Sequence, residues 1–179
     1  MLQPQDCSLT VVDVQGKLAQ LMHDRDSLFT SIRIIIQSAR ILDVPVLWCQ
    51  QVPDALGPTV PQIAELLADC EPVDKSSFSC CGCETYTSAL GQLNRRHAVL
   101  CGIETHVCVY QTAVDLMQSD YEVTVLTDAV SSRTASNKQA GLDRMAAEGV
   151  SLRSVEMICF EWLRTAEHPK FRQIARLVK

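Results

Sequence analysis

A cysteine near the start of an expected helix is the first candidate for chemistry. It lies in the stretch LCGIETHVCVYQT, residues 100–112, where Cys108 comes six residues after the glycine that ends an apolar strand. Thr105 is expected to cap the helix. Free backbone N–H groups and the positive end of the helix dipole would then favour the thiolate form of Cys108. We therefore expect Cys108 to be a nucleophile, although packing is the commoner role of an isolated buried cysteine. Cys101 ends the strand itself and is expected to pack inside the sheet.

A cysteine nucleophile needs a group that accepts its proton. His106 is close in sequence, but residues two apart on a helix point in different directions, so we interpret it as a helix-start residue. Asp13 interrupts the apolar run of residues 8–14 near the end of a strand, where an unpaired buried carboxylate is costly. Asp13 either caps a turn or points into a crevice as the base. Lys75 would supply the balancing charge, unless it is a solvated loop lysine.

The elements that must position these residues follow from apolar runs and helical spacing. Strands alternating with helices predict an α/β domain with a mostly parallel sheet that helices cover on both faces. Ligands bind beyond the carboxyl ends of the strands in such folds. We interpret residues 51–62 and 70–83 as mostly loop. The sequence predicts strands at residues 8–14, 45–50, 97–102, 122–128 and 151–154, and helices at 26–42, 63–68, 84–94, 105–118, 137–148 and 169–178.

Composition restricts the class of protein. The 179 residues are 47% hydrophobic and 21% charged, which predicts one domain, residues 1–179, with a substantial core. A formal charge of −5 and a pI near 5.3 argue against a nucleic-acid partner. No secretory signal and no apolar run of membrane-spanning length is visible, so we expect a cytoplasmic protein without a membrane partner. An odd count of nine cysteines and no signal favour reduced, buried thiols over a disulfide scaffold.

The sequence gives little support for a metal, redox or phosphate site. The run CCGC, Cys80 to Cys83, has a C-x-x-C spacing, but no second C-x-x-C and no histidine pair accompanies it. Zinc binding or disulfide exchange is therefore the weaker interpretation. Neither the glycine-rich phosphate-binding loops nor the G-x-S-x-G nucleophile motif occurs. We expect no metal and no other cofactor.

Three segments resemble the isochorismatase-like cysteine hydrolase superfamily: VVDVQGKL, VDKSSFS and GIETHVCVYQTAVDLMQSDYEVTVLTDAVSSR. Within it, the chain looks most like the isochorismatase domain-containing branch, through VPDALGPTVPQ and SSFSCCG. The resemblance covers nearly the whole chain. It implies a three-layer α/β/α fold with a six-stranded mostly parallel sheet of Rossmann-like topology. It also implies a catalytic triad of Asp13, Lys75 and Cys108, and a non-proline cis peptide between Ile103 and Glu104.

The activity expected from this resemblance is hydrolysis of an amide-like C–N bond, or a related bond, of a small molecule through a thioester-type intermediate. The backbone N–H groups of Glu104 and Cys108 would form the oxyanion hole. We expect Gln15, Phe78 and Tyr110 to line the substrate pocket. Asp128 and Arg133 are expected to brace the loop after the fifth strand. The alternatives are a non-catalytic binding or scaffolding protein that retained the fold, and thiol-based redox activity at the same cysteine.

Two departures from the family pattern affect these expectations. Relatives often carry Thr-Glu-Gln where this chain has Cys49, Gln50 and Gln51, and the Asp-x-His group of metal-binding nicotinamidases is missing. A catalytic metal is therefore not expected. Isochorismate is a doubtful substrate, because members that act on it generally lack the cysteine. The apolar segment MICFEWL, residues 157–163, together with the resemblance, predicts a homo-oligomer.

Overall fold

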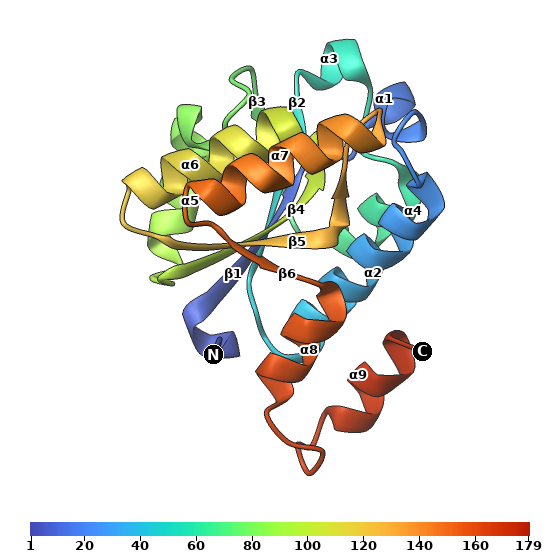
Figure 1. Ribbon diagram of the computed structural model, residues 1–179, viewed down its shortest axis with the longest axis vertical. Coiled ribbons are helices and arrows are strands. Elements are labelled where there is room, and N and C mark those ends of the chain that lie inside the picture. The colour runs from blue at the N-terminus through green and yellow to red at the C-terminus, as the bar shows by residue number, and fades with distance from the viewer.

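An all-parallel sheet of six strands forms the centre of the protein (Figure 1). The computed structural model describes residues 1–179. The strands lie in the order β3-β2-β1-β4-β5-β6, which is the six-stranded sheet that the resemblance implied. Their bounds are β1 Cys7–Val12, β2 Val46–Gln51, β3 Val73–Lys75, β4 His97–Ile103, β5 Glu122–Ser131 and β6 Ser151–Arg153.

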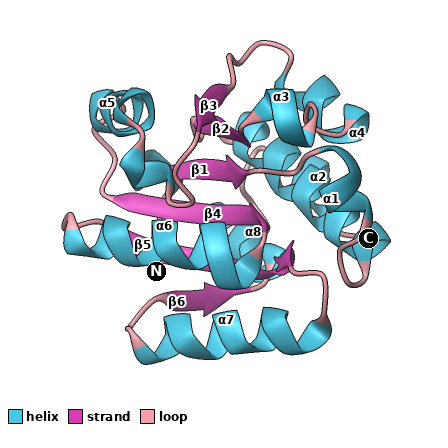
Figure 2. Cartoon of the chain, turned by 90° about the horizontal axis from the view of Figure 1, so that it is seen from above, coloured by secondary structure: helices cyan, strands magenta, loops and turns pink.

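Helices cover both faces of this sheet (Figure 2). None of them is both long enough and apolar enough to cross a membrane. The α-helices are α1 Gly16–Gln20, α2 Arg25–Ile41, α3 Pro53–Leu56, α4 Pro61–Ala64, α5 Glu84–Gln92, α6 Tyr110–Gln118, α7 Ala135–Ala147, α8 Val155–Leu163 and α9 Phe171–Leu177. Three short 3₁₀ turns, η1 Pro4–Asp6, η2 Glu65–Leu67 and η3 Cys80–Gly82, and one π-helical turn, η4 Thr105–Val109, complete the chain.

Two apolar cores, one on each face of the sheet, hold the layers together. In β4, Val99 and Cys101 face the core beneath α2 and α8, whereas Ala98 and Leu100 face the core beneath α5, α6 and α7. All four side chains are fully buried. Successive side chains of a strand point to opposite faces, so a central strand covered on both faces must be apolar throughout. The continuous apolar runs in the sequence reflect this arrangement.

Several elements differ from the sequence-based expectation. α1 and α3 are helices where the sequence predicts none. β3 lies in a segment interpreted as loop; its three residues, of which Asp74 is exposed, are too few to give a periodic signal. α8 forms a helix over the MICFEWL segment, where no helix is expected. The segment is expected to offer apolar surface to a second copy of the chain, but Trp162 and Leu163 lie in the core of the subunit. Only Met157 and Phe160 of α8 are exposed large hydrophobic residues.

The order in which the chain adds strands to the sheet reverses between β1 and β4. It leaves β1 for β2 and β3 on one side and then returns to β4 on the other side of β1. Such a switch point creates a crevice at the carboxyl ends of the two strands. Gly102 allows the end of β4 to approach β1, because a Cβ at its φ of +119° would lie 2.0 Å from the Val12 carbonyl oxygen. The crevice therefore opens between Asp13, which follows β1, and Glu104, which follows β4.

A second close approach fixes the turn that follows β4. Helix α7 packs against η4, and a Cβ at Gly141 would come within 2.9 Å of the backbone nitrogen and Cα of His106. The backbone of the turn thus leaves no room for a larger residue at position 141.

We predict that Gly141→Ala destabilises the protein despite the better helix propensity of alanine. Displacing the η4 backbone should cost about 1–3 kcal/mol of unfolding free energy, as overpacking does elsewhere. Gly91→Ala in α5 is the matched control, because nothing lies within 4 Å of a Cβ there, and it should be neutral or stabilise by up to about 1 kcal/mol. Urea or thermal unfolding of both variants measures the difference. Equal stabilities of the two variants would contradict the tight contact.

Candidate active site

A buried ion pair joins the ends of two strands. Lys75 Nζ, at the end of β3, lies 2.6 Å from Oδ2 of Asp13, and the two side chains are 0% and 3% exposed. Asp13 follows β1 with a φ of +52°, in the left-handed region that aspartate and asparagine tolerate better than most residues. The interpretation of Lys75 as a solvated loop residue is therefore excluded. Asp13 faces the crevice.

The Lys75 ammonium group is fully occupied by acceptors. It donates to Asp13, to Gln51 Oε1 at 2.7 Å and to the carbonyl oxygens of Ser77 and Phe78 at 3.2 and 3.1 Å. Burial alone would lower the pKa of Lys75, but the Asp13 carboxylate and nearby thiols outweigh burial and hold that pKa above its usual range. Lys75 is thus a fixed positive charge with no hydrogen left for a ligand.

Gln51 is a site residue that the sequence interpretation did not identify as such. It ends β2, accepts from Lys75 and donates through Nε2 to the Ser76 carbonyl oxygen at 2.7 Å. Its backbone N–H donates to Gln15 Oε1 at 2.6 Å. A glutamine at the carboxyl end of a parallel strand, beside the strand that ends in Lys75, is the signal that could have indicated this role.

The two oxygens of the Asp13 carboxylate differ in their surroundings. Oδ2 accepts from Lys75, whereas the buried Oδ1 has no hydrogen-bond partner. Burial raises the pKa of Asp13, and the positive charge and hydrogen bond of Lys75 oppose that rise, as does the Cys108 thiol to a smaller extent. The net pKa of Asp13 remains raised. A carboxylate with one free oxygen and a raised pKa is a better proton acceptor than an ordinary aspartate.

Cys108 lies in η4 and shares a cavity with Asp13. The residue is 8% exposed. Burial, followed by the negative charge of Asp13, raises the pKa of the Cys108 thiol to about 12, and Lys75 offsets only part of this. The expectation that the helix start favours the thiolate is therefore wrong for the free protein. Thr105 does not cap the helix either, because its Oγ1 is buried and has no hydrogen-bond partner.

The cavity has a volume of about 100 Å³. Phe78 lines it as expected, but Gln15 and Tyr110 do not. Gln15 is fully buried, and its side chain bonds only backbone groups of Gln51 and Gly57. Tyr110 lies at the start of α6 and is not among the lining residues. The lining residues are Asp13, Leu18, Gln51, Leu56, Phe78, Ile103, Glu104, Val107 and Cys108.

Glu104 connects the cavity to the loop after β5. The peptide bond between Ile103 and Glu104 is cis. The Glu104 Oε1 accepts from the backbone N–H and the Nε of Arg133, both at 3.1 Å, so Arg133 braces this region as expected. The Glu104 backbone N–H donates no hydrogen bond to another backbone group. This N–H is therefore free to donate to a ligand in the cavity.

Two further residues have structural roles outside the cavity. His106 Nδ1 lies 2.9 Å from Ser132 Oγ and forms no contact with Cys108, in agreement with its expected direction. Asp128 lies within β5, and its Oδ1 accepts from the Val155 N–H at 2.8 Å, so it caps α8. Its expected role in bracing the loop after the fifth strand is thus replaced by a role at a helix start.

The CCGC run contributes one thiol beside the ion pair. Cys80 is fully buried, and the Cys49 thiol hydrogen-bonds it. That hydrogen bond, with help from the Lys75 charge, lowers the pKa of Cys80 even though burial opposes it. No cluster of three or more His, Cys, Asp or Glu residues arranged to hold a metal ion occurs in the chain. Cys101 is buried and donates weakly to the Thr10 carbonyl oxygen, as expected for a packing residue.

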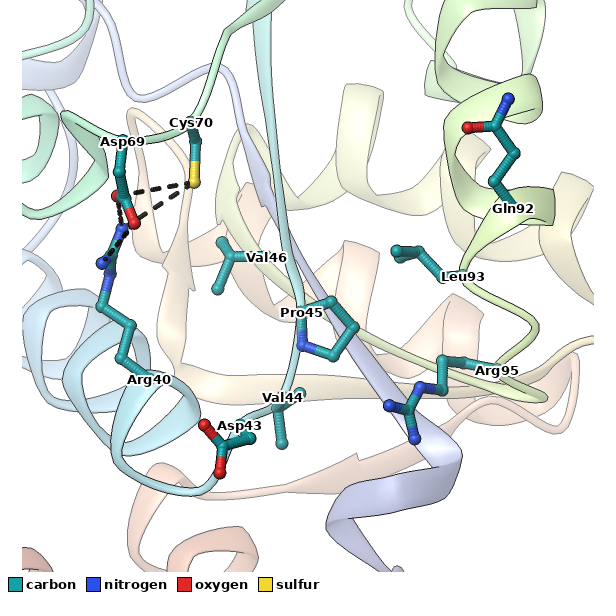
Figure 3. Close-up of a pocket in the computed structure, with 10 residues that line it drawn as sticks. All are labelled: Arg40, Asp43, Val44, Pro45, Val46, Asp69, Cys70, Gln92, Leu93 and Arg95. Atoms are coloured by element: carbon teal, nitrogen blue, oxygen red, sulfur yellow. Dashed lines mark hydrogen bonds and ion pairs between the residues drawn. The ribbon is translucent and has the colours of Figure 1, made fainter.

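A larger hollow lies at the opposite end of the sheet (Figure 3). Its volume is about 590 Å³, and it surrounds Pro45 and Val46, where β2 begins, whereas Gln51 ends that strand at the candidate site. Arg40 on its wall is paired with Asp69 (Figure 3). Ligands of parallel α/β sheets bind at the carboxyl ends of the strands, and this hollow lies at the amino ends. We therefore place the candidate active site at the smaller cavity.

Comparison with known proteins identifies the family of the chain. The family model described as Isochorismatase domain matches residues 7–157. The chain belongs to the isochorismatase domain family. A relative named secreted isochorismatase effector Isc1, from Phytophthora sojae, is 36% identical over 182 residues, covering 99% of this chain and 87% of the relative. Isochorismatase domain-containing protein 2 of Danio rerio is 33% identical over 171 residues, covering 95% and 85%.

A solved structure of this family shares both fold and sequence with the chain. The structure titled MAR1 ribonuclease, from Caenorhabditis elegans, superposes with a TM-score of 0.93 at 34% identity, covering 99% of this chain and 91% of that one. The three-layer α/β architecture is therefore that of isochorismatase-like proteins.

Opposite changes in Cys108 reactivity should follow from removing the two charges beside it. Asp13→Asn removes the anion that disfavours the thiolate, and the left-handed backbone tolerates asparagine. It should lower the pKa of Cys108 and speed alkylation by iodoacetamide at pH 8, about tenfold for each unit of pKa. Lys75→Met removes the cation and should slow alkylation.

Peptide mapping by mass spectrometry after short exposure to iodoacetamide measures these rates. Cys83, which is partly exposed and does not line the cavity, is the internal control in each variant. Slower alkylation of Cys108 in Asp13→Asn than in the unaltered protein would contradict the proposed electrostatics.

Proposed function

We propose that this member of the isochorismatase domain family is a cysteine hydrolase that cleaves an amide-like C–N bond, or a related bond, of a small molecule. The observation that carries the proposal is the buried Asp13–Lys75 pair, whose carboxylate has one oxygen without a hydrogen-bond partner, in a cavity of about 100 Å³ that both Asp13 and Cys108 line. Cys108 is the nucleophile, Asp13 the general base and Lys75 the fixed cation that stabilises the charges formed. These roles are proposals for residues that the family resemblance also implies.

The proton must move as the sulfur attacks, because a thiol with a pKa of about 12 is neutral in the free protein. Sγ of Cys108 bonds to the carbonyl carbon while its proton passes to Asp13. The negative charge on the carbonyl oxygen is held by the N–H groups of Glu104 and Cys108. The C–N bond then breaks, and the leaving nitrogen takes the proton from Asp13. Water, activated by Asp13, hydrolyses the resulting thioester and releases the acid.

A structure of the same fold is titled with a covalently bound small amide. It is YcaC from Pseudomonas aeruginosa with covalent acrylamide, which superposes with a TM-score of 0.89 at 21% identity. That adduct belongs to that protein. It supports the proposal only in that a small amide can reach a reactive group within this fold.

Cleavage of RNA is the second candidate, because the C. elegans structure at 34% identity is titled a ribonuclease. Binding of a phosphate backbone depends on free cationic side chains. In this chain the formal charge is −5, and the cavity is lined by two carboxylates, Asp13 and Glu104, and no cation. We therefore propose a small-molecule substrate. An assay of RNA cleavage against the Cys108→Ala variant tests this choice.

We also propose that the protein is a homo-oligomer without a catalytic metal, located in the cytoplasm. A structure at 20% identity, the YcaC gene product of Escherichia coli, is titled an octameric hydrolase, and Met157 and Phe160 of α8 offer exposed apolar surface for self-association. The relative Isc1 is named a secreted effector, so fractionation of cells that express this protein tests the location.

The proposed mechanism predicts unequal effects of substitutions in the triad. Cys108→Ala should abolish turnover in a screen of small amides, carbamates and related compounds. Asp13→Asn should fold and lose about 10²- to 10⁴-fold in rate, even though it makes Cys108 easier to alkylate. The losses in Asp13→Asn and Lys75→Met should be strongly non-additive, because the residues act as one unit.

Cys83→Ser, outside the cavity, serves as the control and should retain full activity. Undiminished turnover of a folded Asp13→Asn protein would refute the role of Asp13 as base. Formation of sulfenic acid on Cys108 with mild peroxide, without hydrolysis of any compound, would favour the redox alternative instead.

Light scattering should give a molar mass that is a multiple of 19.8 kDa at micromolar concentration. Met157→Lys on the exposed face of α8 should reduce that mass, whereas it should leave the melting temperature of the subunit nearly unchanged. A mass of one subunit for the unaltered protein would contradict the proposed self-association.

A further inference from the structure

We infer that the acyl portion of the substrate, the part bonded to Cys108 in the thioester, is short, uncharged and smaller than an aromatic ring. This inference rests on the proposed function and narrows it. The size of the cavity, the residues that line it and the charges near it each support part of this inference.

The size of the cavity limits the acyl group. Its volume is about 100 Å³. An apolar cavity of about 150 Å³ holds one benzene molecule, so the space beside Cys108 has room for about four carbon-sized atoms. A six-membered aromatic ring does not fit without displacement of a wall. The alkyl chains of acetyl to butyryl groups, which have one to three carbons beyond the carbonyl, do fit.

The walls of the cavity favour an apolar chain. Leu18, Leu56, Phe78, Ile103 and Val107 surround the thiol. Phe78 is 55% exposed and stands where the cavity meets solvent, so the leaving group can extend outward past it. The acyl chain is thus the part enclosed by aliphatic and aromatic side chains.

The charges around the cavity disfavour an anionic acyl group. The two acidic residues in its lining are Asp13 and Glu104, which are paired with Lys75 and Arg133. Lys75 lies behind Asp13, fully buried, and all its hydrogens are directed to protein acceptors. Arg133 lies outside the lining, and its Nε is held by Glu104. A carboxylate on the acyl chain would meet two acidic residues and no cationic side chain in the cavity lining, so we expect it to bind less well than an uncharged chain.

Acyl transfer from p-nitrophenyl esters tests the size limit. In this reaction Sγ of Cys108 bonds to the acyl carbon, the thiol proton passes to Asp13, and the C–O bonding pair leaves with p-nitrophenolate. Acylation by acetate, butyrate and benzoate esters is compared by the release of p-nitrophenolate that is lost in Cys108→Ala, because the proposed hydrolysis removes the acyl group from the cysteine. Each rate is divided by the rate of the same ester with a free thiol. The butyryl group should transfer at least about tenfold faster than the benzoyl group.

Leu56→Ala should enlarge the cavity and restore benzoyl transfer. Leu21→Ala is the matched control, because Leu21 is 63% exposed and does not line the cavity, so its butyryl-to-benzoyl ratio should equal that of the unaltered protein. Iodoacetamide and iodoacetate, which are alike in size, test the charge limit. Their ratio of rates at Cys108, divided by the ratio at Cys83, should exceed about tenfold.

The outcomes separate this inference from the proposed function. Equal transfer of butyryl and benzoyl groups to Cys108 would overturn the size limit and leave the cysteine mechanism intact. A normalised iodoacetamide-to-iodoacetate ratio near one would overturn the charge limit. If no ester acylates Cys108 in the unaltered protein, the proposed cysteine mechanism itself fails.

Discussion

The buried ion pair between Asp13 and Lys75 is the interaction on which the candidate site depends. Taking two charges out of water is costly, and such a pair is tolerated only with close geometry and full hydrogen bonding. The protein meets this requirement for Lys75 with four acceptors drawn from β1, β2 and the loop after β3. It leaves the second oxygen of Asp13 without a partner. Lys75 is therefore fixed by its hydrogen bonds, whereas the unpaired oxygen of Asp13 can accept a proton.

The parallel sheet explains why these groups meet. β1, β2, β3 and β4 all end at the same edge, and the residues at or just after those ends are Asp13, Gln51, Lys75 and Glu104. Close contacts that only glycine permits, at Gly102 and Gly141, set the distance between β1 and β4 and fix the η4 turn that carries Cys108. The fold thus creates a small cavity in which a neutral thiol faces a carboxylate. Both the limited size and the negative character of that cavity follow from the same backbone arrangement.

A neutral resting thiol has a consequence for selectivity. Since burial and Asp13 disfavour the thiolate, general electrophiles meet an unreactive sulfur in the free protein. A substrate that places its carbonyl carbon beside Sγ and its oxygen at the Glu104 N–H offsets the cost of deprotonation during attack. Reactivity then depends on correct binding in the cavity, which protects a chain with nine cysteines from indiscriminate modification at this position.

The sequence by itself determined the α/β class, because uniformly apolar strands alternating with amphipathic helices have few other ways to bury both faces of a sheet. It also indicated Asp13, which interrupts an apolar strand, and Cys108, which lies at an expected helix start, and the motifs around Asp13, Lys75 and Cys108 resemble a known family. It could not locate β3, whose three residues carry no periodic signal, or recognise that α8 buries Trp162 and Leu163. Only the tertiary structure decided the protonation of Cys108, the role of Gln51 and the absence of Gln15 and Tyr110 from the cavity. The physical reason is that pKa values and pocket walls depend on burial and on neighbours from distant strands, which local sequence patterns do not encode.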